Sequence, residues 1–430
     1  MTRTPPAHPE ALLTVADHIG TLAATRSLGR AGVPVVMADA HRLAPARWSR
    51  YVTRRLDCPD PGAAPEAFLA WLLDLGAREP GKVLYPTSDD VALLYAANAD
   101  ALGRHFRTYL PARDAMLAML DKWRLYEACV AEGVPTPRTW RADGPEELAA
   151  IAREATFPLV LKPRTQCFLV PHQKGRVARD AAELAAQHAD LAAATRYAPM
   201  LLALAPEDRA PIAQAFSDTV ERGIVNLSGF VDETGDLFVA EASRKVLQYP
   251  RRLGIGMCFE AVPVPAALAD AVRRLCLRVG HRGAFEVEFV PSPEGDELID
   301  FNPRFYGQMA FDVQRGLDLP WLVYLAAIGE RAELERAVHL ARARIGGAVG
   351  MRHYTNRVEL EVVMRLRRMA GAMSRAELRR WRRWLRDGRH QTVDAVFDRD
   401  DWVPGVVGAA NAVIARALHP RSAWRGAKER

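Results

Sequence analysis

Short apolar runs separated by polar turns occupy the first part of the chain. Residues 11–15, 33–39 and 83–86 have the length and composition of buried strands, and a helical pattern ending at Gly32 lies between the first two. A strand, a helix and a second strand in this order predict a right-handed parallel unit. We therefore expect a Rossmann-like domain over residues 1–115.

The first turn of this domain does not favour a dinucleotide site. It contains only Gly20, whereas the dinucleotide fingerprint needs three glycines for close approach to the pyrophosphate. This disfavours an NAD-linked dehydrogenase. Asp89 and Asp90 follow the third strand, where α/β sheets often bind ligands. They are either weak candidates for substrate contact or caps of a helix at 91–98.

Two lysines stand at the ends of predicted helices or strands, where they could contact a ligand. Lys122 precedes a helical pattern at 126–131, and Lys162 ends the apolar run 157–161. An ammonium group at the end of a buried strand needs a partner or an open cleft, because burying it alone is costly. Polyphosphate is one such partner.

Acidic and apolar residues alternate near residue 290 and predict a hairpin over residues 283–304. If its strands pair antiparallel, Glu288 and Asp300 point from one face, with Asn302 beside them. Two carboxylates and an amide oxygen suit Mg²⁺, and Arg304 adds a planar fork for a carboxylate or phosphate. A surface hairpin with solvated acids is the alternative.

The order of these segments resembles the ATP-grasp superfamily, the fold of D-alanine–D-alanine ligase, biotin carboxylase and carbamoyl-phosphate synthetase. The resemblance covers approximately residues 10–328. It depends on Asp121-Lys122, Lys162-Pro163, Arg244-Lys245, and Glu288 followed by Asp300-x-Asn302-x-Arg304. Two features depart from the family: Asp300 stands where Glu is usual, and residues 164–176 lack the glycine-rich flap of several relatives. We expect a polar or basic flap instead.

The resemblance implies ATP and Mg²⁺ (or Mn²⁺) as cofactors. Glu288, Asp300 and Asn302 take the metal-binding positions of the family. Lys122 and Lys162 take the positions that contact the α- and β-phosphates.

It also implies residues for the reaction and for adenine. Arg244 and Lys245 match a cationic pair that faces the transferred phosphoryl group, and Arg304 is expected to orient the acyl phosphate or the substrate carboxylate. Gln214 and Phe216 flank the hinge strand that holds adenine.

The implied reaction is ATP-dependent joining of a small-molecule carboxylate to an amine through an acylphosphate, with release of ADP and phosphate. A catalytically silent ATP-binding protein and a biotin-type carboxylase remain alternatives. The implied fold class is α/β (α+β), with a pre-ATP-grasp domain at 1–115, a two-lobed ATP-grasp domain at 116–328 and an extension at 329–430. Dimers are common among relatives, so a homodimer remains open.

The extension is predicted to be basic and mainly helical. Apolar stripes at 362–369 and 378–385 alternate with many arginines. These helices either pack on the body or touch an anionic membrane at its surface. The stretch contains no recognised nucleic-acid module, so a specific nucleic-acid partner is not expected.

Composition adds weaker constraints. A net charge of +6 permits an anionic partner such as ATP. Five scattered cysteines and a start without an apolar signal core predict reduced thiols and a cytoplasmic protein. Since the chain lacks a run of eighteen apolar residues, a transmembrane helix is not expected.

Overall fold

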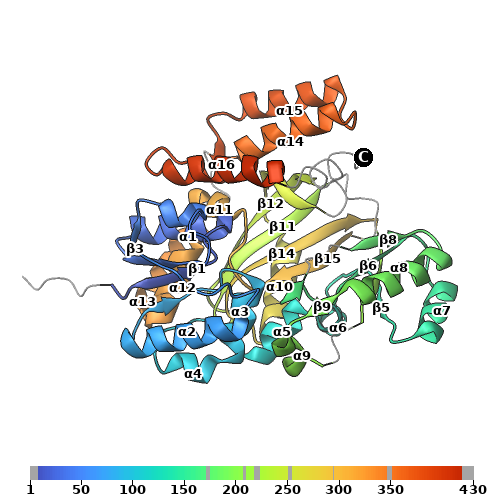
Figure 1. The fold of residues 1–430 in the computed structure, drawn as a ribbon, viewed down its shortest axis with the longest axis horizontal. Coiled ribbons are helices and arrows are strands. Elements are labelled where there is room, and N and C mark those ends of the chain that lie inside the picture. The colour runs from blue at the N-terminus through green and yellow to red at the C-terminus, as the bar shows by residue number, and fades with distance from the viewer. Residues whose placement is uncertain are drawn as a thin grey trace, which may run out of the picture.

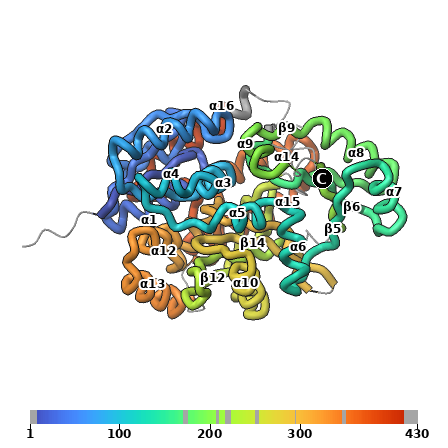
Figure 2. The backbone as a smooth tube through the Cα atoms, turned by 90° about the horizontal axis from the view of Figure 1, so that it is seen from below, coloured from blue at the N-terminus to red at the C-terminus, as the bar shows by residue number. Residues whose placement is uncertain are grey.

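The computed structural model describes residues 8–170, 175–206, 210–216, 223–249, 254–293, 295–345 and 351–418. A large sheet lies between an N-terminal unit, shown in blue, and a small lobe, shown in green (Figure 1). The view from below separates the same three parts (Figure 2). Residues 171–174 of the expected flap lie outside the described residues.

The N-terminal unit is built on a parallel sheet of order β3-β2-β1-β4. Leu12 and Leu13 of β1 pack into two different clusters of buried side chains, so both faces of the sheet are covered. This explains the continuous apolar runs and confirms the predicted parallel unit. Its strands are β1 (Ala11–Thr14), β2 (Val35–Ala38), β3 (Val52–Leu56) and β4 (Val83–Leu84). Its helices are α1 (Ile19–Arg30), η1 (Pro45–Trp48), α2 (Pro65–Arg78), α3 (Asp89–Ala97) and α4 (Ala99–Gly103).

Helices α5 (Arg113–Leu120) and α6 (Lys122–Glu132) lead from this unit to the small lobe. The lobe has an antiparallel sheet of order β5-β10-β6-β8, with α7 and α8 packed on it. Its strands are β5 (Thr139–Arg141), β6 (Leu159–Lys162), β7 (Leu169–Val170), β8 (Arg176–Ala178), β9 (Arg196–Tyr197) and β10 (Ile212–Ala215). Its helices are α7 (Pro145–Glu154), α8 (Ala181–Ala194) and α9 (Pro199–Leu204).

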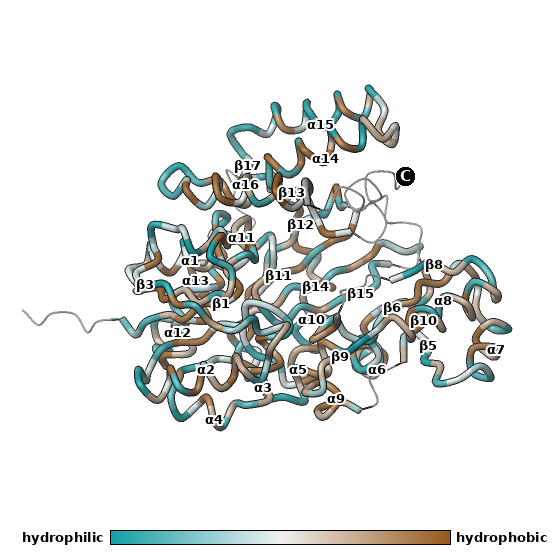
Figure 3. Tube along the Cα trace, in the orientation of Figure 1, coloured by the Kyte–Doolittle hydropathy of each residue, from teal (hydrophilic) through white to brown (hydrophobic). Residues whose placement is uncertain are grey.

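The large sheet has the order β15-β14-β11-β12-β13-β16-β17. Its strands are β11 (Ile224–Val231), β12 (Phe238–Tyr249), β13 (Ile255–Val262), β14 (Gly283–Ser292), β15 (Gly295–Asn302), β16 (His353–Thr355) and β17 (Thr392–Asp394). Helices α6 and α10 (Ala266–Val279) cover the apolar side of its central strands, where Val272 and Leu275 join the cluster of Phe285 and Val287. The hydropathy colouring shows these apolar segments inside the molecule (Figure 3).

The last part of the chain is mainly helical, and it also adds two strands to the large sheet. β16 pairs with β13, and β17 pairs parallel to β16. The sequence pattern did not predict these strands, because each contains only three residues. The helices are α11 (Met309–Arg315), α12 (Leu319–Ile328), α13 (Arg331–Arg344), α14 (Arg357–Met369), α15 (Arg375–Asp387) and α16 (Val403–Leu418).

The apolar side of α15 packs on the body. Trp381 is buried with Leu360 and Met364, and the indole of Trp384 donates to Glu260 on β13. This arrangement supports packing rather than membrane contact. Over the described ranges, we find no helix with the length and hydropathy needed to span a bilayer.

A buried ion pair joins the extension to the N-terminal unit. Arg26 on α1 donates through Nε to Asp401, at 2.9 Å, and through Nη2 to the carbonyl oxygens of Val396 and Asp401. A cluster of buried side chains also contains residues from both regions and from the large sheet. The division at residues 115 and 328 therefore stays a prediction. All five cysteines are free and buried.

Candidate active site

Four polar side chains share one face of the β14–β15 hairpin. Glu288 lies opposite Asp300, and Glu286 lies opposite Asn302. Directly opposed residues in an antiparallel pair point to the same side, as do residues two apart along a strand. The predicted antiparallel pairing is confirmed, and it adds Glu286 to the three residues expected here.

Lys122 approaches this face from the first turn of α6. Its Nζ lies 2.6 Å from Oδ1 of Asp300. The helix begins at this point because the Asp121 carboxylate accepts hydrogen bonds from the backbone N–H groups of Trp123 and Arg124. Burial alone would lower the pKa of Lys122, but the Asp300 carboxylate outweighs it, and the pKa lies above its ordinary value. The lysine is therefore a fixed positive charge.

Lys245 reaches the same face from β12. Its Nζ lies 2.6 Å from Oε1 of Glu288. On β11, Asn226 is opposite both Ser243 and Glu288, so the side chains at 243 and 245 face the same way as Glu288. Each of the two predicted metal-binding carboxylates thus contacts a lysine from a different segment.

Glu286 is the most enclosed acid of the hairpin, with 2% of its surface exposed. Its carboxylate accepts from Nδ2 of Asn302 at 2.6 Å, from Nε2 of Gln308 at 2.9 Å, and from Asn226. Burial raises the pKa of Glu286 to about 7, and the nearby charge of Glu288 raises it further. Sequence reasoning missed this residue, although its alternation with Glu288 was a usable signal.

Arg304 connects the hairpin to the N-terminal unit. Its Nε lies 2.5 Å from Oδ1 of Asp89, and its Nη2 donates to Oδ1 of Asn302 at 2.8 Å. Asp89 therefore belongs to this cluster. Capping of α3 is performed by Ser88, whose side chain accepts from the N–H of Val91, so the expected cap role of the aspartates is wrong.

The turn between β1 and α1 contributes His18, which sequence reasoning also missed because a single histidine has no periodic signal. Burial lowers the pKa of His18 to about 4, and the charge of Arg304 lowers it further, so the ring is neutral near pH 7. Within the described part of the chain its Nδ1 has no hydrogen-bond partner. Two residues after His18, Gly20 lets the start of α1 pack against the backbone of Tyr306. A Cβ at this position would lie 2.5 Å from the Tyr306 carbonyl oxygen.

Solved structures with a similar fold include the biotin carboxylase domain of a 2-oxoglutarate carboxylase from Hydrogenobacter thermophilus in complex with MgADP, ADP and bicarbonate. That structure matches with a TM-score of 0.58 at 16% identity, over 74% of this chain and 70% of its own. An L-amino acid ligase from Bacillus licheniformis matches with a TM-score of 0.56 at 14% identity, over 75% of each chain. The N5-carboxyaminoimidazole synthetase from Staphylococcus aureus gives a TM-score of 0.54 at 12% identity, over 75% of this chain and 79% of its own.

The chain has the ATP-grasp fold. The large chain of carbamoyl phosphate synthase from two strains of Thermus thermophilus is also similar, with 26% identity over 223 residues. That match covers 49% of this chain and 20% of the relative, so the chain spans about a fifth of the length of the curated relatives it matches. No family model matches the sequence.

The small lobe of the ATP-grasp fold carries Lys162 and Gln214 on one face of its sheet. Nζ of Lys162 donates to Oε1 of Gln214 at 2.8 Å, and Nε2 of Gln214 donates to Oγ1 of Thr139 at 3.0 Å. Phe216 follows β10, and its backbone N–H donates to the carbonyl oxygen of Pro158. The structure thus brings Lys162 and Gln214 together, and their contact with ATP stays a prediction.

The segment that follows β6 is hydrogen-bonded to the start of α6. The carbonyl oxygen of Arg164 accepts from the backbone N–H of Lys122 at 2.8 Å, and the Arg164 guanidinium pairs with Asp121 at 2.8 Å, with both side chains 1% exposed. Arg164 is two residues beyond Lys162. The segments that carry the two predicted phosphate-binding lysines are therefore held next to each other.

Arg244 does not join the cluster. The resemblance implied that Arg244 and Lys245 together face the transferred phosphoryl group. Instead β12 continues to Tyr249, and the alternation of side chains along it turns Arg244 to the opposite face from Lys245. The expected cationic pair is thus divided between the two sides of the sheet.

The residues present fit a magnesium ion only as part of a nucleotide complex. Over the described ranges, no three His, Cys, Asp or Glu side chains gather closely enough to hold a metal. Glu288 and Asp300 supply two carboxylates, and Oδ1 of Asn302 keeps a lone pair beside its bond to Arg304. Mg²⁺ commonly takes one or two carboxylates and completes its shell with phosphate oxygens and water.

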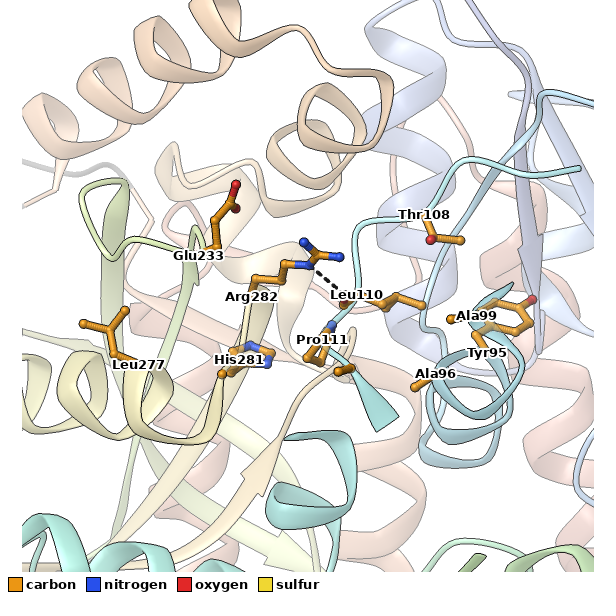
Figure 4. A pocket seen from close by; sticks show the side chains of 12 residues that line it. Tyr95, Ala96, Ala99, Thr108, Leu110, Pro111, Glu233, Leu277, His281 and Arg282 are labelled. Carbon is orange, nitrogen blue, oxygen red and sulfur yellow. Dashed lines mark hydrogen bonds between the residues drawn. The ribbon is translucent and has the colours of Figure 1, made fainter. Parts of the chain in front are cut away.

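A cavity of about 410 Å³ lies away from this cluster, between α3, α4 and the turn from α10 to β14 (Figure 4). Its polar groups pair with one another: Arg282 donates to the carbonyl oxygen of Leu110, and the hydroxyl of Tyr109 donates to Glu233 at 2.5 Å. His281 at its wall packs edge-on against Phe301. We assign this cavity no part in the candidate active site.

Proposed function

We propose that this chain is an ATP-dependent ligase that activates a carboxylate as an acylphosphate and joins it to an amine. The observation that best supports this is the convergence of Lys122 and Lys245 from two other segments on the acidic face of one hairpin, at whose end Arg304 contacts Asn302. A solvated surface hairpin would not gather three cations in this way. Bringing two anions together requires such fixed positive charge.

The nucleotide end of the site is assigned to lysines and hairpin oxygens. Lys122 and Lys162 hold the α- and β-phosphates. Glu288, Asp300 and Asn302 would hold Mg²⁺, which when bound supplies positive charge to the phosphate oxygens. The lysine contacts to Glu288 and Asp300 hold these carboxylates in place before ATP binds.

The reaction has two steps. An oxygen of the substrate carboxylate attacks the γ-phosphorus, the bond from this phosphorus to the bridging oxygen breaks, and ADP leaves. The amine nitrogen then attacks the acyl carbon, loses a proton, and phosphate departs. Lys245 neutralises the transferred phosphoryl group, and Arg304, held by Asp89, orients the acyl phosphate or the carboxylate.

A trapping assay tests this proposal without knowledge of the natural amine. The purified chain is incubated with ATP, Mg²⁺, hydroxylamine and a panel of amino acids and small carboxylic acids. We expect ADP release that requires a carboxylate, together with a hydroxamate of matching mass. Lys245→Met should abolish both signals, whereas Arg383→Met, an exposed change of equal charge on α15, should leave them unchanged.

Two results would contradict the proposal. One is the absence of Mg²⁺-dependent ATP binding, which would also exclude the silent ATP-binding alternative. The other is ADP release that requires bicarbonate and proceeds without any amine, which would favour a carboxylase of the biotin type instead.

A further inference from the structure

A second cavity, of about 330 Å³, lies on the side of β12 away from Lys245. It lies between the large sheet and α15 of the extension and opens to solvent. Its walls are formed by Gly223, Arg244, Val246, Glu260, Arg380, Trp381 and Trp384. Two indole rings and two guanidinium groups therefore surround one small volume.

The wall of this cavity carries two arginines and one acid. Arg244 and Arg380 are exposed, and neither forms an ion pair with any residue that the structure describes. Glu260 is directly opposite Arg244 across the β12–β13 pair, yet its carboxylate accepts from the indole of Trp384, at 2.6 Å. The one acid in the wall is thus directed to a neutral donor, and the cavity keeps a net positive charge.

One wall of the cavity is a buried indole that supports an arginine. Trp381 is 3% exposed, and its indole N–H has no hydrogen-bond partner among the described residues. A buried donor without an acceptor costs free energy, and native proteins seldom retain one. Arg380 stacks on this same ring, with its guanidinium carbon 5.1 Å from the ring centroid. The indole N–H itself is closed to solvent, so an anion in the cavity would first meet the guanidinium groups of Arg380 and Arg244.

We propose that this cavity binds a small anion that carries carboxylate or phosphate groups. Arg244 and Arg380 provide forked donors that match either group. The walls of Trp384 and Val246 suit an apolar or planar part of the same molecule. The site is separate from the nucleotide site, because Arg244 and Lys245 project from opposite faces of one strand.

Calorimetric titration of the full chain with citrate and with pyrophosphate tests the inference. Both titrations are made with saturating ATP and excess Mg²⁺, so that the nucleotide site does not compete for the probe, and the heat of probe–Mg²⁺ association is subtracted from a titration without protein. Arg244→Gln and Arg380→Gln should each weaken binding about 10-fold or more, since each removes a charge-assisted contact. Arg383→Gln, on the same helix but outside the cavity, should change it less than about 2-fold.

The choice of probe separates the two ligand chemistries. Tighter binding of pyrophosphate assigns a phosphate ligand, and tighter binding of citrate assigns a carboxylate ligand.

Three outcomes would overturn the inference: no binding of either probe by the unaltered chain up to about 10 mM, equal weakening by Arg383→Gln, or unchanged binding in both cavity variants. Lys245→Gln makes failure of this site distinguishable from failure of the proposed function. It should impair ATP binding and retain the anion titration, whereas Arg244→Gln should do the reverse.

Discussion

Replacing Asp401 by asparagine should destabilise the chain markedly. The Asp401 carboxylate is 1% exposed and accepts from Nε of Arg26 at 2.9 Å, from Oγ of Ser49 at 2.7 Å and from the backbone N–H of Arg50 at 2.8 Å. Asparagine keeps the shape but leaves the Arg26 guanidinium, which is 7% exposed, without a counter-charge. Losing one partner of a buried pair typically costs 3–5 kcal/mol, and the two carbonyl acceptors that Arg26 retains put the expected loss near 3 kcal/mol.

The neighbouring Asp398 supplies a matched control. It pairs with Arg30 at 2.6 Å, but the two side chains are 34% and 20% exposed, so Asp398→Asn should cost no more than about 1 kcal/mol. Urea unfolding followed by circular dichroism measures both variants as shifts of the midpoint. If Asp401→Asn proves no less stable than Asp398→Asn, our account of how the extension is attached to α1 is refuted.

Three further predictions concern the site and the core. Glu288→Gln should lower turnover by about 100-fold or more while the chain still folds, because the amide oxygen can still accept from Lys245; an active variant or an unfolded one would contradict the assignment. Removal of divalent cations with EDTA should stop ADP release, and added Mg²⁺ should restore it; turnover that survives chelation would exclude a metal at Glu288 and Asp300. Burial lowers the pKa of His281 to about 3, whereas an unfolded histidine titrates near pH 6.5. Below that pH the unfolded chain binds more protons, so stability should fall by about 1.4 kcal/mol per pH unit as pH drops towards 3. In thermal melts between pH 7 and 4, His281→Gln should flatten this dependence and the exposed His390→Gln should not.

The hairpin face could be predicted because it follows from local rules. Strand alternation fixed which acids share a side, and the length of the apolar runs indicated the parallel strands of the N-terminal unit. The end of β12 could not be predicted in this way. Directly after Ala242 come the polar residues 243–245, and pairing with β13 keeps this stretch extended. Because that pairing is not local, the sequence alone did not show that Arg244 and Lys245 are separated.

The partners of site residues were also hidden from sequence reasoning. His18 and Asp89 come near Arg304 only through packing of the N-terminal unit on the large sheet. The enclosure of Glu286 is visible only in the structure, because its amide donors come from three separate segments of the chain. Residue type and spacing gave candidates, whereas the contacts that select among them depend on the tertiary fold.

The attachment of β16 along β13 has a consequence for solubility. Without the extension, β13 would be the outermost strand of the sheet, and its free backbone N–H and C=O groups would form a template for a second copy. Chains truncated before β16 should therefore associate through the exposed edge of β13, even if the small lobe and the β14–β15 hairpin fold correctly. The C-terminal extension therefore protects the edge of the sheet from self-association, because β16 covers β13. Its loss should first be observed as precipitation.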